Sequence, residues 1–368
     1  MAGPWRLISS WCPVTAARLS SGDVKYVPTD GTPSLKKAIV RYTELHYQKS
    51  VGPANVVVAS GAKQAIMSAL YALLEPGDEV LYPAPYWVSY PEMVKLAGGV
   101  PVVAAAADGS FQPTVADMAG RCTGRTKAII LNSPNNPSGI MYSRDFIADM
   151  VDFCERKQIW LIMDDIYNRL VFEGRTAPNA YEFAPADLDH ARLVVIQGVS
   201  KMYAMTGFRI GWAIVGRELA TAMGNIQSHM TSGSATPSQW ASIGALEGDQ
   251  SNIDDLRAAL ESNRNLMLER LAGIRGLRTP KPDGTFYCFP DCRAFGKSSM
   301  QLAEFLLEKV RVVVVPGNEF GMEGYLRMSY CGSAKDVSDG VERIRWALDP
   351  SAPEEIVVGD RTLRRDWT

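Results

Sequence analysis

One stretch of the chain decides the fold: residues 193–215 read LVVIQGVSKMYAMTGFRIGWAIV. Its two apolar runs, 193–197 and 210–215, predict buried strands. The connection between them carries the motif Ser-Lys-x5-Gly-x-Arg, with a lysine at position 201 and an arginine at position 209. Ligands of an open parallel sheet bind outside the carboxyl ends of its strands. The stretch therefore predicts a sheet and a ligand site at its edge.

The same pattern extends outward along the chain. Short apolar runs predict further strands at 56–59, 79–82, 100–105, 127–131 and 159–163. Helical patterns separate most of them: one helix opens at Thr32-Pro33 and reaches about residue 48, and another runs from 62 to 74. Alternating strands and helices predict an α/β fold with a largely parallel sheet.

The pattern changes near residue 250, where Gly248-Asp249-Gln250-Ser251 interrupts it. A long charged helix is predicted from 253 to 274, and a Gly-Thr-Phe-Tyr-Cys segment follows at 284–288. Further helices and strands are predicted at 300–309, 312–315, 325–329 and 335–348. We therefore divide the chain into a divergent N-terminal segment (1–15), a large domain (16–250), a smaller α+β domain (251–349) and a loose surface tail (350–368).

Composition excludes several classes of protein. The 368 residues carry 38 Lys and Arg against 40 Asp and Glu, and the resulting charge of −2 gives no electrostatic reason to expect nucleic acid or an anionic membrane as partner. The longest nearly apolar stretch, 98–107, contains Pro101 and is too short to span a bilayer. Six scattered cysteines and three histidines lack zinc-site, hydrolase and metalloprotease spacing, so we predict no metal.

Polar residues gather where the predicted strands end. Gly61-Ala62-Lys63 follows one strand at the start of a helix, residues 132–139 read NSPNNPSG after another, and Asp164-Asp165-Ile166-Tyr167 follows a third. The set lacks the glycine motif of dinucleotide sites and a Walker A lysine. It suits pyridoxal phosphate, which needs a lysine amine for its aldehyde, an anion site for its phosphate and a carboxylate for its ring nitrogen.

With these motifs, residues from about 16 to 348 resemble a class I aminotransferase of the fold type I pyridoxal-phosphate family. The runs 132–139, 164–167, 200–201 and 206–211 carry the resemblance in combination. Two further segments, PYWVSYPE at 85–92 and Val315-Pro316-Gly317, bring it closest to bacterial-type aspartate aminotransferases, some of which also accept prephenate. The resemblance implies a mostly parallel mixed sheet between helices, a smaller C-terminal domain and a homodimer.

The resemblance also implies catalytic roles. Lys201 is expected to form the internal aldimine and then to move the proton between the substrate Cα and the cofactor. Asp164 is expected to hold the ring nitrogen, with a helix N-cap as the alternative. Tyr167 and Asn136 are expected to contact the ring oxygen and lower the pKa of the aldimine. The Asn136-Pro137 pair, which could otherwise be an ordinary turn, is expected to be a cis peptide.

The resemblance implies that the phosphate binds Arg209 and the backbone N–H groups of Gly61-Ala62-Lys63. Many relatives place a serine three residues before the lysine, where this chain has Gly198, and we expect Ser200 to compensate. Tyr26 is expected to reach the phosphate in the neighbouring subunit, so that each active site is shared between two chains. A packing tyrosine is the alternative.

Substrate is expected to bind between Arg327, Trp87, Asn136 and Lys63. The planar fork of Arg327 fits an α-carboxylate, and Trp87 is expected to stack on the cofactor ring. In the bacterial-type aspartate enzymes the lysine after Gly-Ala contacts the distal carboxylate; as a mere surface residue, Lys63 would oppose the helix dipole. We therefore predict ping-pong transamination between aspartate and 2-oxoglutarate.

Other interpretations use the same cofactor set. The chain could be an aminotransferase for prephenate, aromatic amino acids or alanine, or a pyridoxal-phosphate lyase. Relatives carry an N-terminal Gly-x-Pro segment that closes over the substrate, where this chain has residues 1–15; without it, a cofactor-binding protein with impaired turnover is a further alternative. We expect a cytoplasmic protein, although the first 22 residues, which lack Asp and Glu, also fit an organelle transit peptide or an unstructured start.

Overall fold

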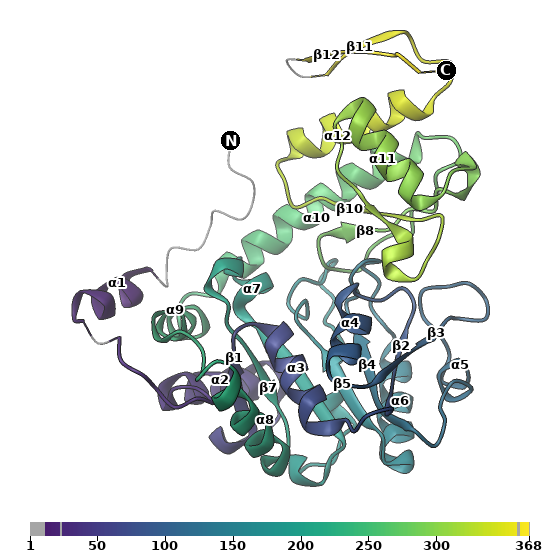
Figure 1. Cartoon of the computed structure of the whole chain (residues 1–368). Coiled ribbons are helices and arrows are strands. Elements are labelled where there is room, and N and C mark those ends of the chain that lie inside the picture. The colour runs from purple at the N-terminus through teal and green to yellow at the C-terminus, as the bar shows by residue number, and fades with distance from the viewer. Residues whose placement is uncertain (1–11, 23, 359–360, 368) are drawn as a thin grey trace.

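A seven-stranded sheet forms the centre of the computed structural model, which describes residues 12–22, 24–358 and 361–367 (Figure 1). In order across the sheet, the strands are β1 (Val56–Ala59), β7 (Gly211–Ile214), β6 (Leu193–Gly198), β5 (Trp160–Asp164), β4 (Thr126–Asn132), β2 (Glu79–Pro83) and β3 (Val100–Ala104). Strands β2 to β6 pair in parallel, whereas β7 is antiparallel to both β6 and β1. The predicted α/β fold with a mostly parallel sheet is confirmed.

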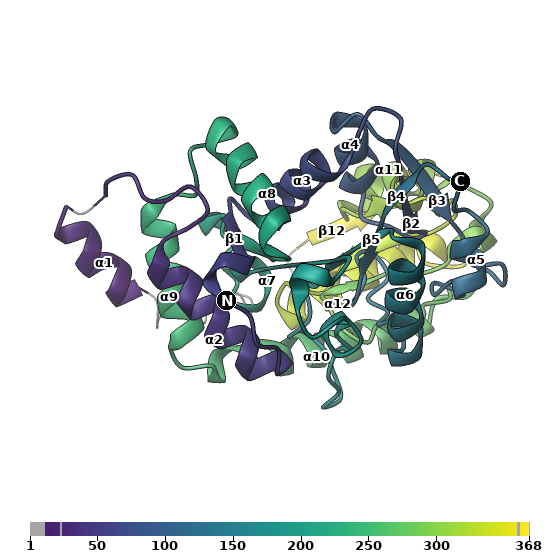
Figure 2. The same ribbon diagram turned by 90° about the horizontal axis from the view of Figure 1, so that it is seen from below.

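Helices cover both faces of this sheet. One face carries α2 (Pro33–Tyr47), α6 (Arg144–Lys157) and α9 (Thr236–Glu247). The other carries α3 (Ala62–Leu73), α4 (Ser89–Leu96) and α8 (Arg217–Met230), and Figure 2 shows α3, α4 and α8 on the side opposite α2 and α6. Two short helices, α5 (Val115–Ala119) and α7 (Val199–Met202), follow β3 and β6.

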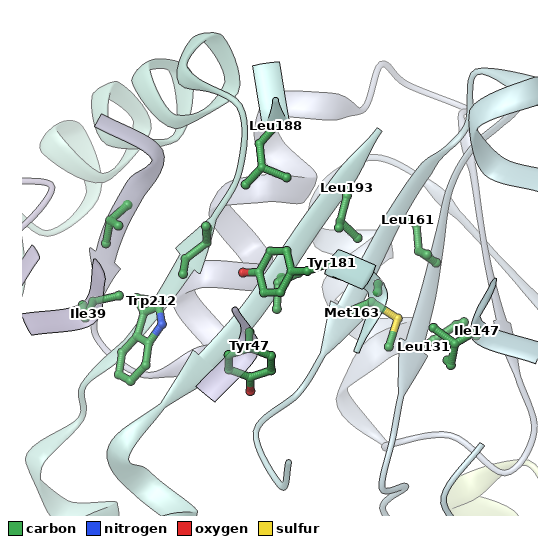
Figure 3. Packing of buried hydrophobic residues seen from close by; sticks show 14 of the residues in the cluster. Ile39, Tyr47, Leu131, Ile147, Leu161, Met163, Tyr181, Leu188, Leu193 and Trp212 are labelled. Carbon is green, nitrogen blue, oxygen red and sulfur yellow. The ribbon is translucent and has the colours of Figure 1, made fainter. Parts of the chain in front are cut away.

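Side chains alternate between the two faces, so that each strand contributes to two hydrophobic cores. In β4, Ile129 and Leu131 belong to one core, and Ala128 and Ile130 belong to the other. Figure 3 shows the first core, in which Leu131, Leu161 and Leu193 come from three neighbouring strands. Strands covered on both faces read as continuous apolar runs, and these runs are the pattern from which the sheet was predicted.

A smaller unit follows along the chain. Its antiparallel sheet has the order β8 (Tyr287–Cys288), β10 (Leu326–Ser329) and β9 (Val315–Pro316). Three helices pack with it: α10 (Ser251–Ala272), α11 (Ser299–Val310) and α12 (Ala334–Leu348). Its hydrophobic core also includes Ile166, Tyr167, Leu170 and Phe172, which follow β5, so the packing joins the two units. The division of the chain at residue 250 stays a prediction.

The predicted strand at 312–315 is wrong for three of its four residues. Helix α11 ends in a left-handed turn at Arg311, after which Val312 N donates back to Leu306 O. Val312 and Val314 then pack against the core of the smaller unit, while Val313 is 78% exposed. Only Val315 enters β9. The apolar run therefore packs on one side without joining a ladder.

The C-terminal tail is not the loose segment that was predicted. Strands β11 (Glu355–Val358) and β12 (Arg361–Arg364) form an antiparallel hairpin beside α12 (Figure 1). The Trp367 ring lies 5.2 Å from the ring of Trp346 and 5.4 Å from that of Phe305. Arg365 donates hydrogen bonds to the backbone oxygens of Trp346 and Asp349. These contacts anchor the tail to α11 and α12.

At the other end of the chain, residues 1–11 of the predicted N-terminal segment lie outside the described residues. Helix α1 (Cys12–Ser20) packs against α9, where the Arg18 guanidinium lies 5.8 Å from the Trp240 ring. Within the described ranges, no helix has both the length and the apolar character needed to cross a membrane.

Candidate active site

One cavity of about 400 Å³ lies at the carboxyl ends of β4, β5 and β6, beside the start of α3. Most of its lining follows these strands, and Tyr287 and Arg327 are added from β8 and β10 of the smaller sheet. The structure thus gathers residues that are far apart in the sequence. The lining residues are Ala62, Lys63, Trp87, Val88, Asn132, Asn136, Asp164, Ile166, Tyr167, Ser200, Lys201, Thr206, Arg209, Tyr287 and Arg327.

Asp164, the last residue of β5, lines the cavity with only 4% of its surface exposed. Tyr90 donates a hydrogen bond of 2.7 Å to Asp164 Oδ2, and Asn132 Nδ2 donates one of 2.7 Å to the Asp164 backbone oxygen. Asp164 Oδ1 has no hydrogen-bond partner among the described residues. Residues 166–169 form a turn, so the N-cap alternative is wrong. The unpartnered oxygen is placed to accept a hydrogen bond from a bound ligand.

Burial raises the pKa of Asp164 to about 6, although the hydrogen bond from Tyr90 and the nearby charge of Lys201 both lower it. A carboxylate that is costly to ionise gains most from a cationic partner, because the partner offsets the lost hydration. A protonated ring nitrogen is such a partner.

Lys201 lies in α7, directly after β6, and its Nζ is 5.3 Å from the Phe286 ring and 5.8 Å from the Tyr167 ring. Burial lowers the pKa of this amine; the charge of Asp164 opposes the shift, and the charges of Arg209 and Arg327 add to it. A lowered pKa increases the fraction of neutral amine, which is the nucleophilic form.

Tyr167 and Asn136 lie on the same cavity. Burial raises the pKa of Tyr167, and a side-chain hydrogen bond with Tyr287 raises it further, so the phenol keeps its proton and can donate it. Asn132 Oδ1 accepts the backbone N–H of Asn136 at 2.8 Å, which fixes the loop. The Asn136-Pro137 peptide is cis, as the resemblance implied.

The predicted phosphate site is built by a close approach of two turns. Gly61 has φ +88° at the start of α3, and a Cβ added there would collide with the guanidinium of Arg209. A Cβ at Gly211 would collide with the backbone of Ala62. Arg209, itself at φ +55°, donates a hydrogen bond of 3.0 Å from Nη1 to Thr206 O. The arginine is therefore held against the amino end of α3, where backbone N–H groups are available to an anion.

Gly198, where relatives are expected to carry a serine, has a local reason to be glycine. A Cβ there would lie 2.9 Å from both the Gly211 Cα and the Ile210 O. Ser200, two residues later, lines the cavity. The backbone of β6 and β7 at this point leaves no room for a side chain.

Lys63 and Trp87 lie together at the cavity. Lys63, in the first turn of α3, is exposed, and its Nζ lies 4.8 Å from the Trp87 ring centroid. Arg327 approaches from β10, and its Nη1 donates a hydrogen bond of 3.0 Å to Asn136 Oδ1. The cavity therefore presents two cationic side chains besides Lys201 and Arg209.

Tyr26 is not brought to this cavity. It is 94% exposed and borders a separate hollow with Lys25 and residues 231–237. Sequence reasoning also missed Asn132, Tyr90 and Tyr287. Asn132 opened a quoted motif and Tyr287 followed Gly-Thr-Phe, but only the fold shows that their side chains reach the site.

The residues present fit pyridoxal phosphate. The unpartnered oxygen of Asp164 suits its ring nitrogen, and the glycine cradle beside Arg209 suits its phosphate. Lys201 supplies an amine with a lowered pKa, and Tyr167 and Asn136 supply hydrogen-bond donors. Each of these features is present in the chain itself.

Comparison with known proteins agrees with this arrangement. The sequence family described as "Aminotransferase class I and II" matches residues 9–344. An aspartate aminotransferase of Bacillus sp. YM-2 is 37% identical over 335 residues, covering 89% of this chain and 84% of the relative. An aspartate/prephenate aminotransferase of Cereibacter sphaeroides is 40% identical over 339 residues, with 89% and 84% coverage. The crystal structure of an aspartate aminotransferase from Rhizobium meliloti superposes with a TM-score of 0.90 at 35% identity, covering 95% of this chain and 90% of that one.

The fold and the site define a pyridoxal-phosphate-dependent enzyme of fold type I. Within that class, the chain belongs to the class I and II aminotransferases and resembles the bacterial aspartate aminotransferases. Its substrates are therefore amino acids and 2-oxo acids.

Proposed function

We propose that the enzyme transfers amino groups between aspartate and 2-oxoglutarate. One observation carries this choice: Lys63 and Arg327, from different parts of the chain, add two cations to one cavity beside Lys201. A substrate with two carboxylates can pair with both, and aspartate, glutamate and their oxo acids have two. The names of the relatives from Bacillus and Cereibacter support the same substrate class.

When bound, pyridoxal phosphate supplies an aldehyde that takes the amino group and a ring that accepts the electron pair of the Cα–H bond. Lys201 is the group that removes the proton from Cα and returns it, because its amine is near the site and has a lowered pKa. Asp164 keeps the ring nitrogen protonated. Arg209 and the amino end of α3 hold the phosphate, and Arg327 orients the α-carboxylate.

A second substrate is favoured by the same two cations. Prephenate is an oxo acid with two carboxylates, one beside its oxo group and one on its ring, so it can pair with both Arg327 and Lys63. Lys63 is exposed and lies over the Trp87 ring, so its ammonium group is accessible to the second carboxylate. Prephenate, which the name of the Cereibacter relative includes, is therefore the second amino acceptor that we propose to test.

The site is proposed to be completed by a second copy of the chain. Tyr26 is 94% exposed, and Leu19 and Val24, which lie close in sequence, are 49% and 54% exposed. Apolar side chains exposed together favour a protein partner. A twofold homodimer would place Tyr26 of one chain near the phosphate cradle of the other.

The amino-donor half-reaction tests the function. The cofactor-loaded enzyme is mixed with one amino acid at a time, and absorbance reports conversion of the aldehyde form to the amine form. We expect aspartate and glutamate to convert it fastest. Conversion by other amino acids only would refute the aspartate assignment. No conversion by any amino acid would favour a binding protein, and release of a cleaved product would indicate a lyase.

Lys63→Ala tests the observation on which we base the choice of aspartate as substrate. Losing a charge-assisted hydrogen bond costs about 1.5–3 kcal/mol, so kcat/KM for aspartate should fall roughly tenfold to hundredfold, with little change for alanine. Lys95→Ala is the matched control, because Lys95 is a surface lysine of α4 paired with Glu92. An equal loss for both amino acids would assign Lys63 to the cofactor or to stability.

A further inference from the structure

The guanidinium of Arg327 lies over two aromatic rings. Its Cζ is 4.4 Å from the ring centroid of Tyr287 and 4.9 Å from that of Phe320. Tyr287 is on β8, which pairs with β10, and Phe320 ends the short 3-10 helix η7 (Gly317–Phe320) that follows β9. Both strands next to β10 thus lead to a ring that contacts the arginine.

Other aromatic residues pack against Phe320 and restrict its movement. It is fully buried, and its ring meets that of Phe289 edge-on at 5.7 Å. Phe289 in turn stacks on Tyr325 at 5.1 Å, and Phe111, from the segment after β3, packs at 5.8 and 5.6 Å against these two rings. This aromatic cluster connects the two units, because Phe111 belongs to the large unit and the other three rings belong to the smaller unit.

The turn that carries Phe320 is also tied to the segment before Trp87. Tyr86 N donates a hydrogen bond of 3.2 Å to Phe320 O. Gly321 has φ +78°, and an added Cβ would lie within 2.5 Å of the Tyr86 ring. Phe320 can therefore move little without displacing the segment that leads to Trp87 at the cavity.

A guanidinium that stacks on an aromatic ring keeps its N–H groups available. Arginine stacks on aromatic faces through its own planar face, while its N–H groups point outward in the plane. One of these, on Nη1, already donates to Asn136 Oδ1. An arginine held in this way loses less conformational freedom when a carboxylate binds.

We propose that Phe320 is a positioning residue for substrate binding, which holds the Arg327 guanidinium in its carboxylate-binding orientation through ring stacking. The inference rests on the proposed role of Arg327 toward the α-carboxylate. Phe320 is absent from the residues that line the cavity, within the ranges that the structure describes, so it acts through Arg327. Every amino acid and oxo acid substrate carries that carboxylate, so the effect extends to all of them.

The test is Phe320→Leu, which keeps a buried apolar side chain and removes the ring face. A cation–π contact of a desolvated pair corresponds to a factor of about three to thirty in affinity. KM should rise by about this factor for aspartate and for alanine alike, while kcat and the absorbance spectrum of the bound cofactor stay nearly unchanged. Phe320→Met, which fills the same space with a flexible side chain, serves if the leucine variant does not fold.

Phe172→Leu is the matched control. Phe172 is also fully buried, and the Arg264 guanidinium lies 4.8 Å from its ring. This substitution removes an equivalent stacked pair away from the residues that line the cavity. A structural effect alone would lower stability in both variants and leave KM unchanged. Phe320→Leu must therefore raise KM more than Phe172→Leu does, and equal KM values would overturn the inference.

Binding of maleate, a dicarboxylate without an amino group, separates this inference from the proposed function. Calorimetry on the cofactor-loaded enzyme should give weaker binding for both Arg327→Lys and Phe320→Leu. If Arg327→Lys binds maleate as the wild type does, the proposed role of Arg327 is wrong. If Arg327→Lys weakens binding and Phe320→Leu does not, that role stands and the positioning role of Phe320 is refuted.

Discussion

Asp164→Asn should stabilise the cofactor-free protein while weakening its hold on the cofactor. The substitution keeps the shape of the side chain and the contact with Tyr90 but removes the charge. In the folded chain the pKa of Asp164 is raised from 3.8 to about 6, chiefly by burial. The folded protein thus holds this proton more tightly than the unfolded chain does, and the free energy of unfolding falls as pH rises between these values.

The size of the effect follows from the two pKa values. The difference between pKa values of 3.8 and about 6 corresponds to a loss of about 3 kcal/mol in the free energy of unfolding. This loss is absent at low pH and complete above about pH 6. Asparagine carries no such cost. The free energy of unfolding of Asp164→Asn should therefore exceed that of the wild type by an amount that grows by about 2 kcal/mol between about pH 4.5 and about pH 7.5.

Urea unfolding of the cofactor-free wild type and variant at several pH values measures this advantage. Asp165→Asn is the matched control, because Asp165 is also buried, its Oδ1 also has no partner in the described part of the chain, and burial raises its pKa well above the usual range. Both variants should be stabilised at neutral pH, but only Asp164→Asn should weaken cofactor binding, by roughly tenfold to hundredfold. A constant stability difference across the pH range would refute the burial of a titrating carboxylate at position 164.

Three further predictions concern the lysine, the assembly and the C-terminal hairpin. Lys201→Ala should abolish transamination and leave a cofactor that dialysis removes; borohydride reduction of the wild type followed by mass spectrometry should label Lys201, and label on another lysine would contradict the assignment. When Lys201→Ala and Tyr26→Ala chains are unfolded, mixed and refolded, the mixture should be more active than the average of the two variants. About half of the dimers are then mixed, so about a quarter of all sites carry neither substitution. An activity equal to the average of the two variants, with mixed dimers present, would mean that Tyr26 serves its own chain or none. Trp367→Ala should lower the free energy of unfolding by about 1–2 kcal/mol without changing KM, because its ring packs on Trp346 and Phe305; an unchanged urea midpoint would show that the hairpin adds no stability.

The central sheet was predictable because its strands are buried on both faces. Runs such as 128–131 and 193–196 contain apolar residues only, and the structure pairs both of them with β5. The run at 312–315 looks the same in sequence, but the left-handed turn at Arg311 and packing on one side keep it out of a ladder. Burial on one face and burial on two faces cannot be told apart in so short an apolar run.

The site was predictable where it follows the strands. Asp164 ends β5 and Lys201 follows β6, so the topology of a parallel sheet is enough to bring them together, and Arg209 lies in the short connection from β6 to β7. Tyr287 reaches the cavity from another sheet, and Tyr90 reaches Asp164 from a helix, so both depend on tertiary packing that local sequence does not encode. The C-terminal hairpin was missed for the same reason, since Trp367 anchors it across a long distance in sequence.

The position of β1 has a consequence for how the chain is made. Val56 pairs with Ile214, so the ribosome must synthesise every residue between them before β1 finds its partner, which takes roughly ten to thirty seconds. Until then β1 has no neighbouring strand, and both of its edges stay open to other chains. Gly61 and Arg209 meet only when this pairing forms, so the phosphate cradle does not exist on a nascent chain that ends before β7. The anion site therefore depends on a pairing between distant parts of the chain, and it forms late in synthesis although Gly61 is made early.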